Sequence, residues 1–118
     1  MSATIAAISS TALAEGHEHH HHGGAKKYAS LIASSGDCLQ TGEACLAYCL
    51  VLLGNGEKEM ASCAQSVNEL LAVCSALQKL AGQDSKNTTK LAKLAAEVCA
   101  DCEKECRKHE KKHAECKT

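Results

Sequence analysis

The chain has 118 residues, a length typical of a single domain. Its net charge of −1 gives no electrostatic case for binding nucleic acid or an anionic membrane surface. The longest apolar run, residues 44–53, is about half of the ~20 residues that a transmembrane helix needs. The sequence has no Phe, Trp or Pro but nine Cys, and its abundant Ala, Leu, Glu and Lys favour helix throughout. Because Ala and Cys bury little apolar area, we expect disulfides or bound metal to supplement the core.

Residues 1–14 (MSATIAAISSTALA) have the composition of an export-signal remnant and end in an A-x-A cleavage pattern. No Lys or Arg precedes Lys26, so the charged start of such a signal is missing. We expect an exported, periplasmic protein, with a cytoplasmic location as the alternative. Residues 15–24 (EGHEHHHHGG) should form a disordered His/Gly-rich arm. An interrupted His run behind a cleavage pattern favours a natural metal-catching arm over an affinity tag.

Residues 25–118 have the pattern of a helical bundle. The first predicted helix covers residues 26–53 and ends at Gly54, although Gly36 and Gly42 weaken it and could kink it. The second covers residues 57–81 and is followed by a loop in which Ser85 or Asn87 can cap the next helix. The third runs from residue 88 to near the C-terminus, with Lys and Arg in its last turns. Short loops predict an all-α, antiparallel bundle with three core helices.

The cysteines form one row on each predicted helix. An α-helix turns about 100° per residue, so the three on the first helix fall within about 40°, the two on the second within about 20°, and the next three within about 60°. These rows comprise Cys38, Cys45 and Cys49; Cys63 and Cys74; and Cys99, Cys102 and Cys106. Each row lies within or beside the Ala/Leu/Val face, as Val67 and Leu70 show on the second helix. The thiols should therefore point inward.

Three explanations of the rows compete. Ordinary buried cysteines behave as small hydrophobic residues, but nine aligned thiols fit that explanation poorly. Disulfides are permitted in an exported protein, and the spacings of Cys63 with Cys74 and of Cys106 with Cys116 are similar to those of disulfide-stapled helical hairpins. However, nine is an odd number, and thiols four residues apart on one helix are poorly directed for bridging.

The third explanation is a soft metal ion. Cys45 with Cys49, or Cys102 with Cys106, places two sulfurs one turn apart on the same face, where they can hold one ion between them. Copper(I) prefers thiolate ligands and accepts low coordination numbers. Zinc takes four ligands, usually from knuckle or loop spacings, and iron–sulfur clusters need convergent cysteine sets. The dispersed pairs therefore favour several copper(I) ions.

Three further residue types extend the predicted site. His109, His113 and Cys116 continue the spacing of Cys106 by three, four and three residues along the third helix. Imidazole binds copper as well, although surrounding lysines also fit a solvated surface. Met60 precedes Cys63 by three residues and can offer a thioether or simply pack in the core. The predicted metal ligands are Cys38, Cys45, Cys49, Cys63, Cys74, Cys99, Cys102, Cys106, Cys116, His109, His113 and Met60.

Residues 37–53 (DCLQTGEACLAYCLVLL), 62–80 (SCAQSVNELLAVCSALQKL) and 98–117 (VCADCEKECRKHEKKHAECK) resemble the copper storage proteins. These are exported or cytosolic bacterial proteins that hold copper(I) inside a cysteine-lined four-helix bundle. The resemblance implies that the Cys and His of these stretches bind copper(I) for copper-dependent enzymes such as methane oxidation systems. It also implies oligomers for exported members, and a twin-arginine signal that this sequence does not show.

One departure from the family concerns its fourth helix. The resemblance implies that further cysteines follow the equivalent of Glu115, Cys116 and Lys117 in that helix, whereas the sequence given ends at Thr118. We therefore expect three core helices of the four-helix-bundle type and favour a homo-oligomer.

The sequence thus predicts a non-enzymatic copper(I) store that binds neither nucleic acid nor membrane and possesses no nucleophile–base set for catalysis. A copper metallochaperone or sensor and a disulfide-stapled interaction module are the alternatives.

Overall fold

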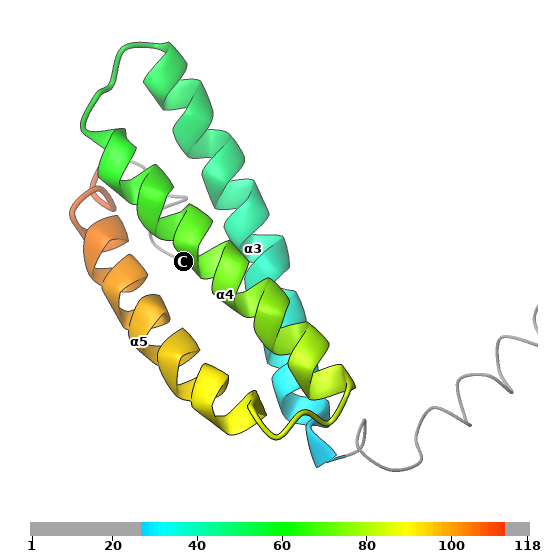
Figure 1. Ribbon diagram of the computed structural model, residues 1–118. Helices are drawn as coiled ribbons and strands as arrows, with labels where there is room; N and C mark the ends of the chain where they lie inside the picture. The colour runs from blue at the N-terminus through cyan, green and yellow to red at the C-terminus, as the bar shows by residue number, and fades with distance from the viewer. Residues whose placement is uncertain (1–26, 113–118) are drawn as a thin grey trace, which may run out of the picture.

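A computed structural model describes residues 27–112, and the structural statements below concern that part of the chain. It contains the helices α3 (Ala29–Gly54), α4 (Met60–Gly82) and α5 (Thr88–Arg107), and no strand occurs in this range (Figure 1). Consecutive helices run antiparallel, and α4 packs against both of the others. The predicted all-α antiparallel bundle is confirmed. The expected signal remnant and His/Gly-rich arm, together with His113 and Cys116, lie outside the described residues.

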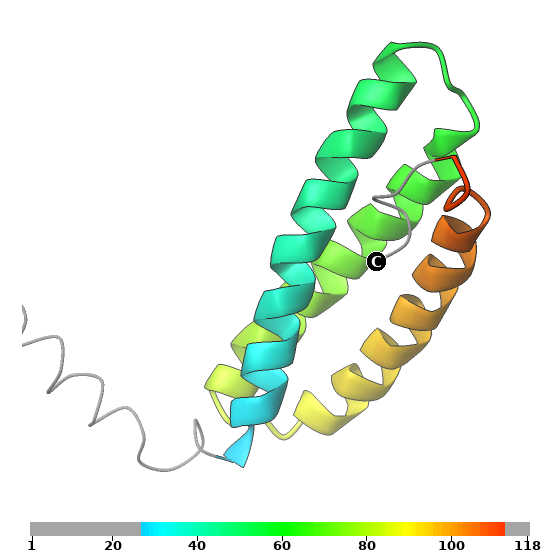
Figure 2. The same ribbon diagram turned by 180° about the vertical axis from the view of Figure 1, so that it is seen from behind.

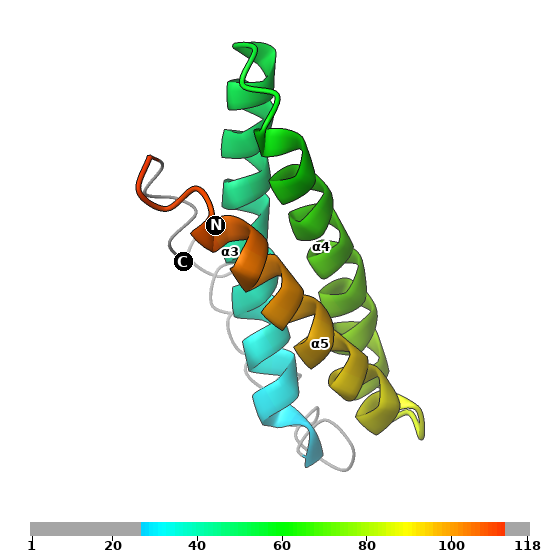
Figure 3. The same cartoon turned by 90° about the vertical axis from the view of Figure 1, so that its left-hand side faces the viewer.

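Helix α4 is the central element of the arrangement. Seen from behind in Figure 2, α3 and α5 lie on either side of α4, and the side view of Figure 3 shows α5 crossing the bundle at an angle to α3. Because α3 and α5 pack mainly on α4 rather than on each other, the space between them is bordered by side chains from all three helices.

Helix α3 runs without a break through both of its interior glycines. Gly42 is buried, and a Cβ atom added to it would lie 2.7 Å from Leu71 Cδ2 on α4. The missing side chain therefore allows α3 and α4 to approach closely at this level. From the sequence we expected Gly42 to weaken the helix. In the structure α3 is continuous at Gly42, and this glycine packs against Leu71 of α4.

Helices α3 and α4 end in the same way. After each helix one residue adopts a left-handed conformation, and the next amide donates to a carbonyl five residues earlier. After α3 that residue is Gly56, with φ of 90°, and the Glu57 amide donates to the Leu52 carbonyl at 3.0 Å. After α4 it is Asp84, with φ of 54°, and the Ser85 amide donates to the Leu80 carbonyl at 3.0 Å. In the loop between α4 and α5, the Ser85 Oγ also accepts a hydrogen bond from the Asn87 amide at 3.1 Å.

Two predicted boundaries are wrong. Helix α4 begins at Met60 rather than at residue 57, because the Met60 amide donates to the Glu57 carbonyl in a turn that completes the loop. Helix α5 ends at Arg107 rather than near the C-terminus, and amides beyond it donate three residues back, as His109 does to the Cys106 carbonyl at 3.0 Å. No apolar residue lies between Cys106 and Ala114 in the sequence. Continued helix there would bury no apolar side chain, which is the main source of helix stability in proteins.

The core is small and sulfur-rich. The largest side chains that are fully buried include Met60, Val67, Cys49 and Cys63. Large apolar side chains also remain on the surface, since Leu50, Val51 and Leu94 are 57%, 60% and 47% exposed. Within residues 27–112, none of the helices combines the length and the apolar character that crossing a membrane would require.

Candidate metal centre

The predicted inward direction of the thiols is confirmed for the eight cysteines that the structure describes. Six are buried, and Cys38 and Cys99 are half-buried. No disulfide joins any of these eight. Val67, which shares the row of thiols on α4, is 1% exposed. The antiparallel order of the helices then decides which thiols from different rows come together.

Three thiols meet in the half of the bundle near the loop between α3 and α4. They come from Cys45 on α3, Cys63 on α4 and Cys106 on α5, and their sulfur atoms all lie within 4.8 Å of one another. The Cys63 and Cys106 sulfurs are 3.4 Å apart. We call this group the Cys63 cluster. All three residues are buried, so the cluster belongs to the core itself.

Three other thiols meet nearer the opposite end of the bundle. Cys38 on α3, Cys74 on α4 and Cys99 on α5 again place their sulfur atoms within 4.8 Å of one another. We call this group the Cys74 cluster. Cys74 is 3% exposed, whereas its two partners are half-buried. Each of the two clusters thus takes one thiol from each helix.

This grouping adds to the one that the sequence suggested. The sequence predicted pairs along a single helix, Cys45 with Cys49 and Cys102 with Cys106, and the thiols of both pairs interact in the structure. The structure also brings thiols together across helices, because inward-pointing side chains at the same height on packed helices meet in the space between the helix axes. Cys63 and Cys74, eleven residues apart on α4, are separated by about 16 Å along the helix axis, too far for the suggested disulfide.

Two further buried thiols, those of Cys49 and Cys102, belong to neither three-sulfur group. Cys49 is fully buried and donates a weak hydrogen bond to the Cys63 sulfur at 3.8 Å. Cys102 is buried one turn before Cys106 on α5, at a height between the two clusters. Cys49 thus extends the Cys63 cluster on the α3 side, and Cys102, which interacts with Cys106, extends it along α5 toward the Cys74 cluster.

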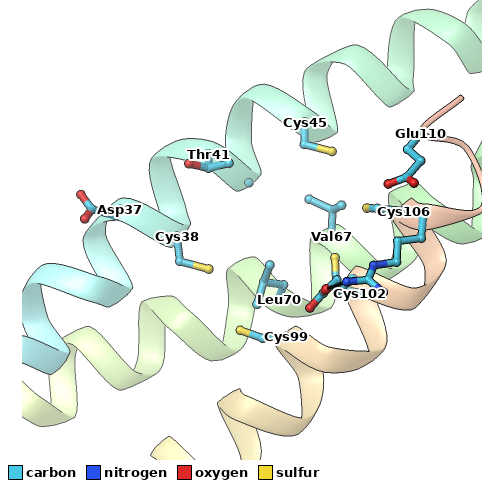
Figure 4. Close-up of a pocket in the computed structure, with 13 residues that line it drawn as sticks. Asp37, Cys38, Thr41, Cys45, Val67, Leu70, Cys99, Cys102, Cys106 and Glu110 are labelled. Carbon is cyan, nitrogen blue, oxygen red and sulfur yellow. Dashed lines mark hydrogen bonds and ion pairs between the residues drawn. The ribbon is translucent and has the colours of Figure 1, made fainter. Parts of the chain in front are cut away.

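Both clusters and Cys102 contribute thiols to the lining of a groove of about 640 Å³ between α3 and α5. Figure 4 shows Cys38 and Cys45 on α3 and Cys99, Cys102 and Cys106 on α5 directed into this space. Its floor is formed by Val67 and Leu70 of α4, and its border carries the charged residues Asp37, Glu103, Arg107 and Glu110. Several thiols are thus reachable from the groove without unfolding of a helix.

Four of the six clustered thiols, and Cys49 beside them, have pKa values raised by their surroundings. Burial raises the pKa of Cys74 to about 12, with Cys38 contributing in the same direction. The neighbouring Cys102 thiol raises the pKa of Cys106 to about 11. The pKa of Cys45 is raised by its hydrogen bond with Cys106 and by burial, and burial raises the pKa of Cys49 and Cys99. A cation entering the cluster must therefore displace protons, as thiolate ligation requires.

His109 and Met60 do not enter either three-sulfur group. His109 lies in the turn after α5, with its Nε2 buried, 3.9 Å from Glu105 Oε2 and without a hydrogen-bond partner among the described residues. The predicted continuation of the helix to His109 is wrong, since α5 ends at Arg107 and the His109 amide instead donates to the Cys106 carbonyl in a turn. Met60 is fully buried in the apolar cluster that contains Cys49 and Cys63. Ligation by either residue stays a prediction.

Sequence reasoning missed one residue that positions the site. Gly42 lies between Cys38 and Cys45 on α3 and, through its contact with Leu71, sets how closely those thiols approach α4. The sequence did contain a signal for this role, because a glycine four residues after Cys38, within the row of cysteines, can indicate close packing against a neighbouring helix.

The comparisons with known proteins agree with this geometry. No curated protein matches the chain in sequence. The model of one protein family, described as copper storage protein (Csp), matches residues 24–118, a range that includes every helix and every cysteine described above. The chain therefore belongs to the copper storage protein family.

Proposed function

We propose that this protein binds and stores several copper(I) ions through the thiolates that line its helical bundle. The observation that carries the proposal is the presence of two three-sulfur clusters, each built from all three helices. Copper(I) is a soft cation that prefers thiolate ligands. Sulfur atoms within 4.8 Å of one another surround a position where a single ion can contact two or three of them.

The additional thiols support storage of more than one ion per cluster. Three thiolates around one monovalent cation leave a net negative charge, and a buried charge is unfavourable unless it is compensated. Cys49 lies 3.8 Å from Cys63 and Cys102 lies one turn from Cys106. Further copper ions that share thiolates with these neighbours would offset the excess charge. Storage, rather than single-ion transfer, uses all eight described thiols.

A copper titration tests the proposal. The reduced apo-protein is titrated anaerobically with copper(I) against a chromophoric copper(I) chelator, and we expect several equivalents per chain. Cys63→Ser and Cys74→Ser should each lower the capacity, because each removes the α4 thiol of one cluster. Ala64→Ser is the matched control, since it adds a buried hydroxyl beside Cys63 and removes no thiol.

The outcomes separate the alternatives. Saturation at one equivalent or less would rule out storage and favour a copper metallochaperone or sensor. Unreduced protein in which mass spectrometry finds four disulfides would favour a disulfide-stapled interaction module. Uptake should release protons and weaken as the pH falls, because the thiols must lose their protons to bind.

The setting of this function is part of the proposal. We propose a binding protein rather than an enzyme, exported to the periplasm, that supplies copper to a copper-requiring enzyme. The exposure of Leu50, Val51 and Leu94 supports association of chains into a homo-oligomer, because contact with another chain would remove these apolar side chains from water. Light scattering of the purified protein tests the oligomer, and detection of the chain in the periplasmic fraction of its host tests export.

A further inference from the structure

We propose that the Cys63 cluster and the Cys74 cluster each also bind one trivalent arsenic atom, taken up as arsenous acid. This function is separate from copper storage. It depends on the convergence of three sulfur atoms, which copper(I) does not require. In each cluster three sulfur atoms from three different helices converge on one point, within 4.8 Å of one another, instead of lying along one helix. Trivalent arsenic forms three bonds directed to one side, with a lone pair on the other, so replacing all three of its hydroxyl groups requires three convergent thiols.

The exchange of bonds is balanced and needs no redox partner. Arsenous acid, As(OH)₃, loses its three hydroxyl groups while three thiols each lose one hydrogen, so three As–O and three S–H bonds break. Three As–S bonds form, three water molecules leave, and arsenic stays trivalent throughout. The product carries no net charge. A neutral product suits a buried, largely apolar position better than a charged one, because burying an uncompensated charge is costly.

The structure also provides access for the reagent. Cys38 and Cys99 are half-buried and both line the groove between α3 and α5 (Figure 4), so arsenous acid can reach two thiols of the Cys74 cluster from solvent. In the Cys63 cluster, Cys45 and Cys106 line the same groove. The third thiol of each cluster comes from α4, beneath the groove. Arsenic that has bonded to two groove thiols is therefore directed toward the third.

The number of atoms taken up distinguishes the two functions. Copper(I) ions can share thiolates, so copper capacity follows the total number of thiols. Arsenic takes three thiols to itself, so its capacity follows the number of three-thiol clusters, which is two among the described residues. Cys49 and Cys102 should consequently contribute to copper uptake and not to arsenic uptake.

Native mass spectrometry of the full chain tests the inference. The experiment uses a Cys116→Ser background, so that only the described thiols are counted, phosphine as the reductant, and sodium arsenite as the probe. We expect two arsenic atoms per chain, each accompanied by the loss of three hydrogens. Cys38→Ser and Cys99→Ser should each retain only one such atom. Both replace half-buried residues, and their helical circular dichroism reports folding. Thr41→Ser, which changes a groove residue on α3 without removing a thiol, should still bind two.

Three results would overturn the inference: no arsenic adduct, an adduct heavier by one water that reveals a retained hydroxyl and only two As–S bonds, or two fully substituted atoms in both Cys38→Ser and Cys99→Ser. Copper titration of the same samples separates this inference from the proposed function. Copper uptake without arsenic binding removes only the inference, whereas arsenic binding without multiple copper removes only copper storage.

Discussion

Replacing Gly42 by alanine tests whether the close approach of α3 to α4 builds the metal centre. Gly42 lies between Cys38 and Cys45, the thiols that α3 contributes to the two clusters. An added Cβ would meet Leu71 Cδ2 at 2.7 Å and Cγ at 3.4 Å, and Val67 Cγ1 at 3.9 Å. The first distance is shorter than real Cβ contacts, so Leu71 or the whole of α3 has to move.

The magnitude follows from two opposing effects. Glycine in a helix interior is less favourable than alanine by about 0.5–1 kcal/mol. Overpacking a well-packed interior costs about 1–3 kcal/mol. We therefore expect Gly42→Ala to lower the free energy of unfolding by about 0–2.5 kcal/mol. Gly36→Ala is the matched control on the same helix, because its new Cβ meets only the flexible end of Gln78, at 3.1 Å. It should raise the free energy of unfolding by about 0.5–1 kcal/mol.

Urea denaturation of the reduced apo-proteins, followed by circular dichroism, measures both values. Copper titration of the same variants should show weaker uptake by Gly42→Ala, because displaced α3 carries Cys38 and Cys45 away from α4, and unchanged uptake by Gly36→Ala. If Gly42→Ala proves as stable as Gly36→Ala and binds copper as well, the two helices do not depend on this contact and the reasoning is refuted.

Asp84→Gly should raise the free energy of unfolding by about 0.5–1 kcal/mol, because glycine adopts the left-handed conformation at this helix end without strain; an unchanged urea midpoint would contradict this. The apo-protein should lose stability as the pH rises above 9.0, since burial raises the pKa of Cys74 to about 12 and the Cys102 thiol raises that of Cys106 to about 11. Groups with raised folded-state pKa values contribute full stability below the unfolded value and lose it as the pH approaches the folded value; urea midpoints that stay constant between pH 9.0 and 11 would count against buried neutral thiols. Copper loading should raise the melting temperature, by the equivalent of about 2.7 kcal/mol for one site when free copper is a hundredfold above its Kd, and a strong copper(I) chelator should restore the apo value. Ser62→Ala should cost only about 0.5 kcal/mol, because it removes one exposed hydrogen bond, 2.8 Å long, to Glu105; a loss of several kcal/mol would show that this contact has a larger structural role.

The sequence by itself determined the helices, their order and the direction of the thiols. Helical periodicity places each cysteine row on one face, and apolar neighbours such as Val67 on the same face require that face to be buried. Gly56 marks the end of α3 because a left-handed residue is needed there. These are local properties of the chain, so they can be read from residue type and spacing alone.

Only the tertiary structure decided which thiols meet. Cys45 interacts with Cys49 one turn along α3, as the spacing predicts, but its three-sulfur cluster with Cys63 and Cys106 could not be read from the spacing. This grouping depends on the relative heights of three helices, which the two loops and the contact at Gly42 set together. The end of α5 at Arg107 could not be predicted from the sequence either. Charged residues there favour helix locally, but they offer no apolar side chain to bury, and helices in proteins are stabilised mainly by such burial. Long-range packing, rather than local spacing, turns three rows of thiols into two three-sulfur clusters.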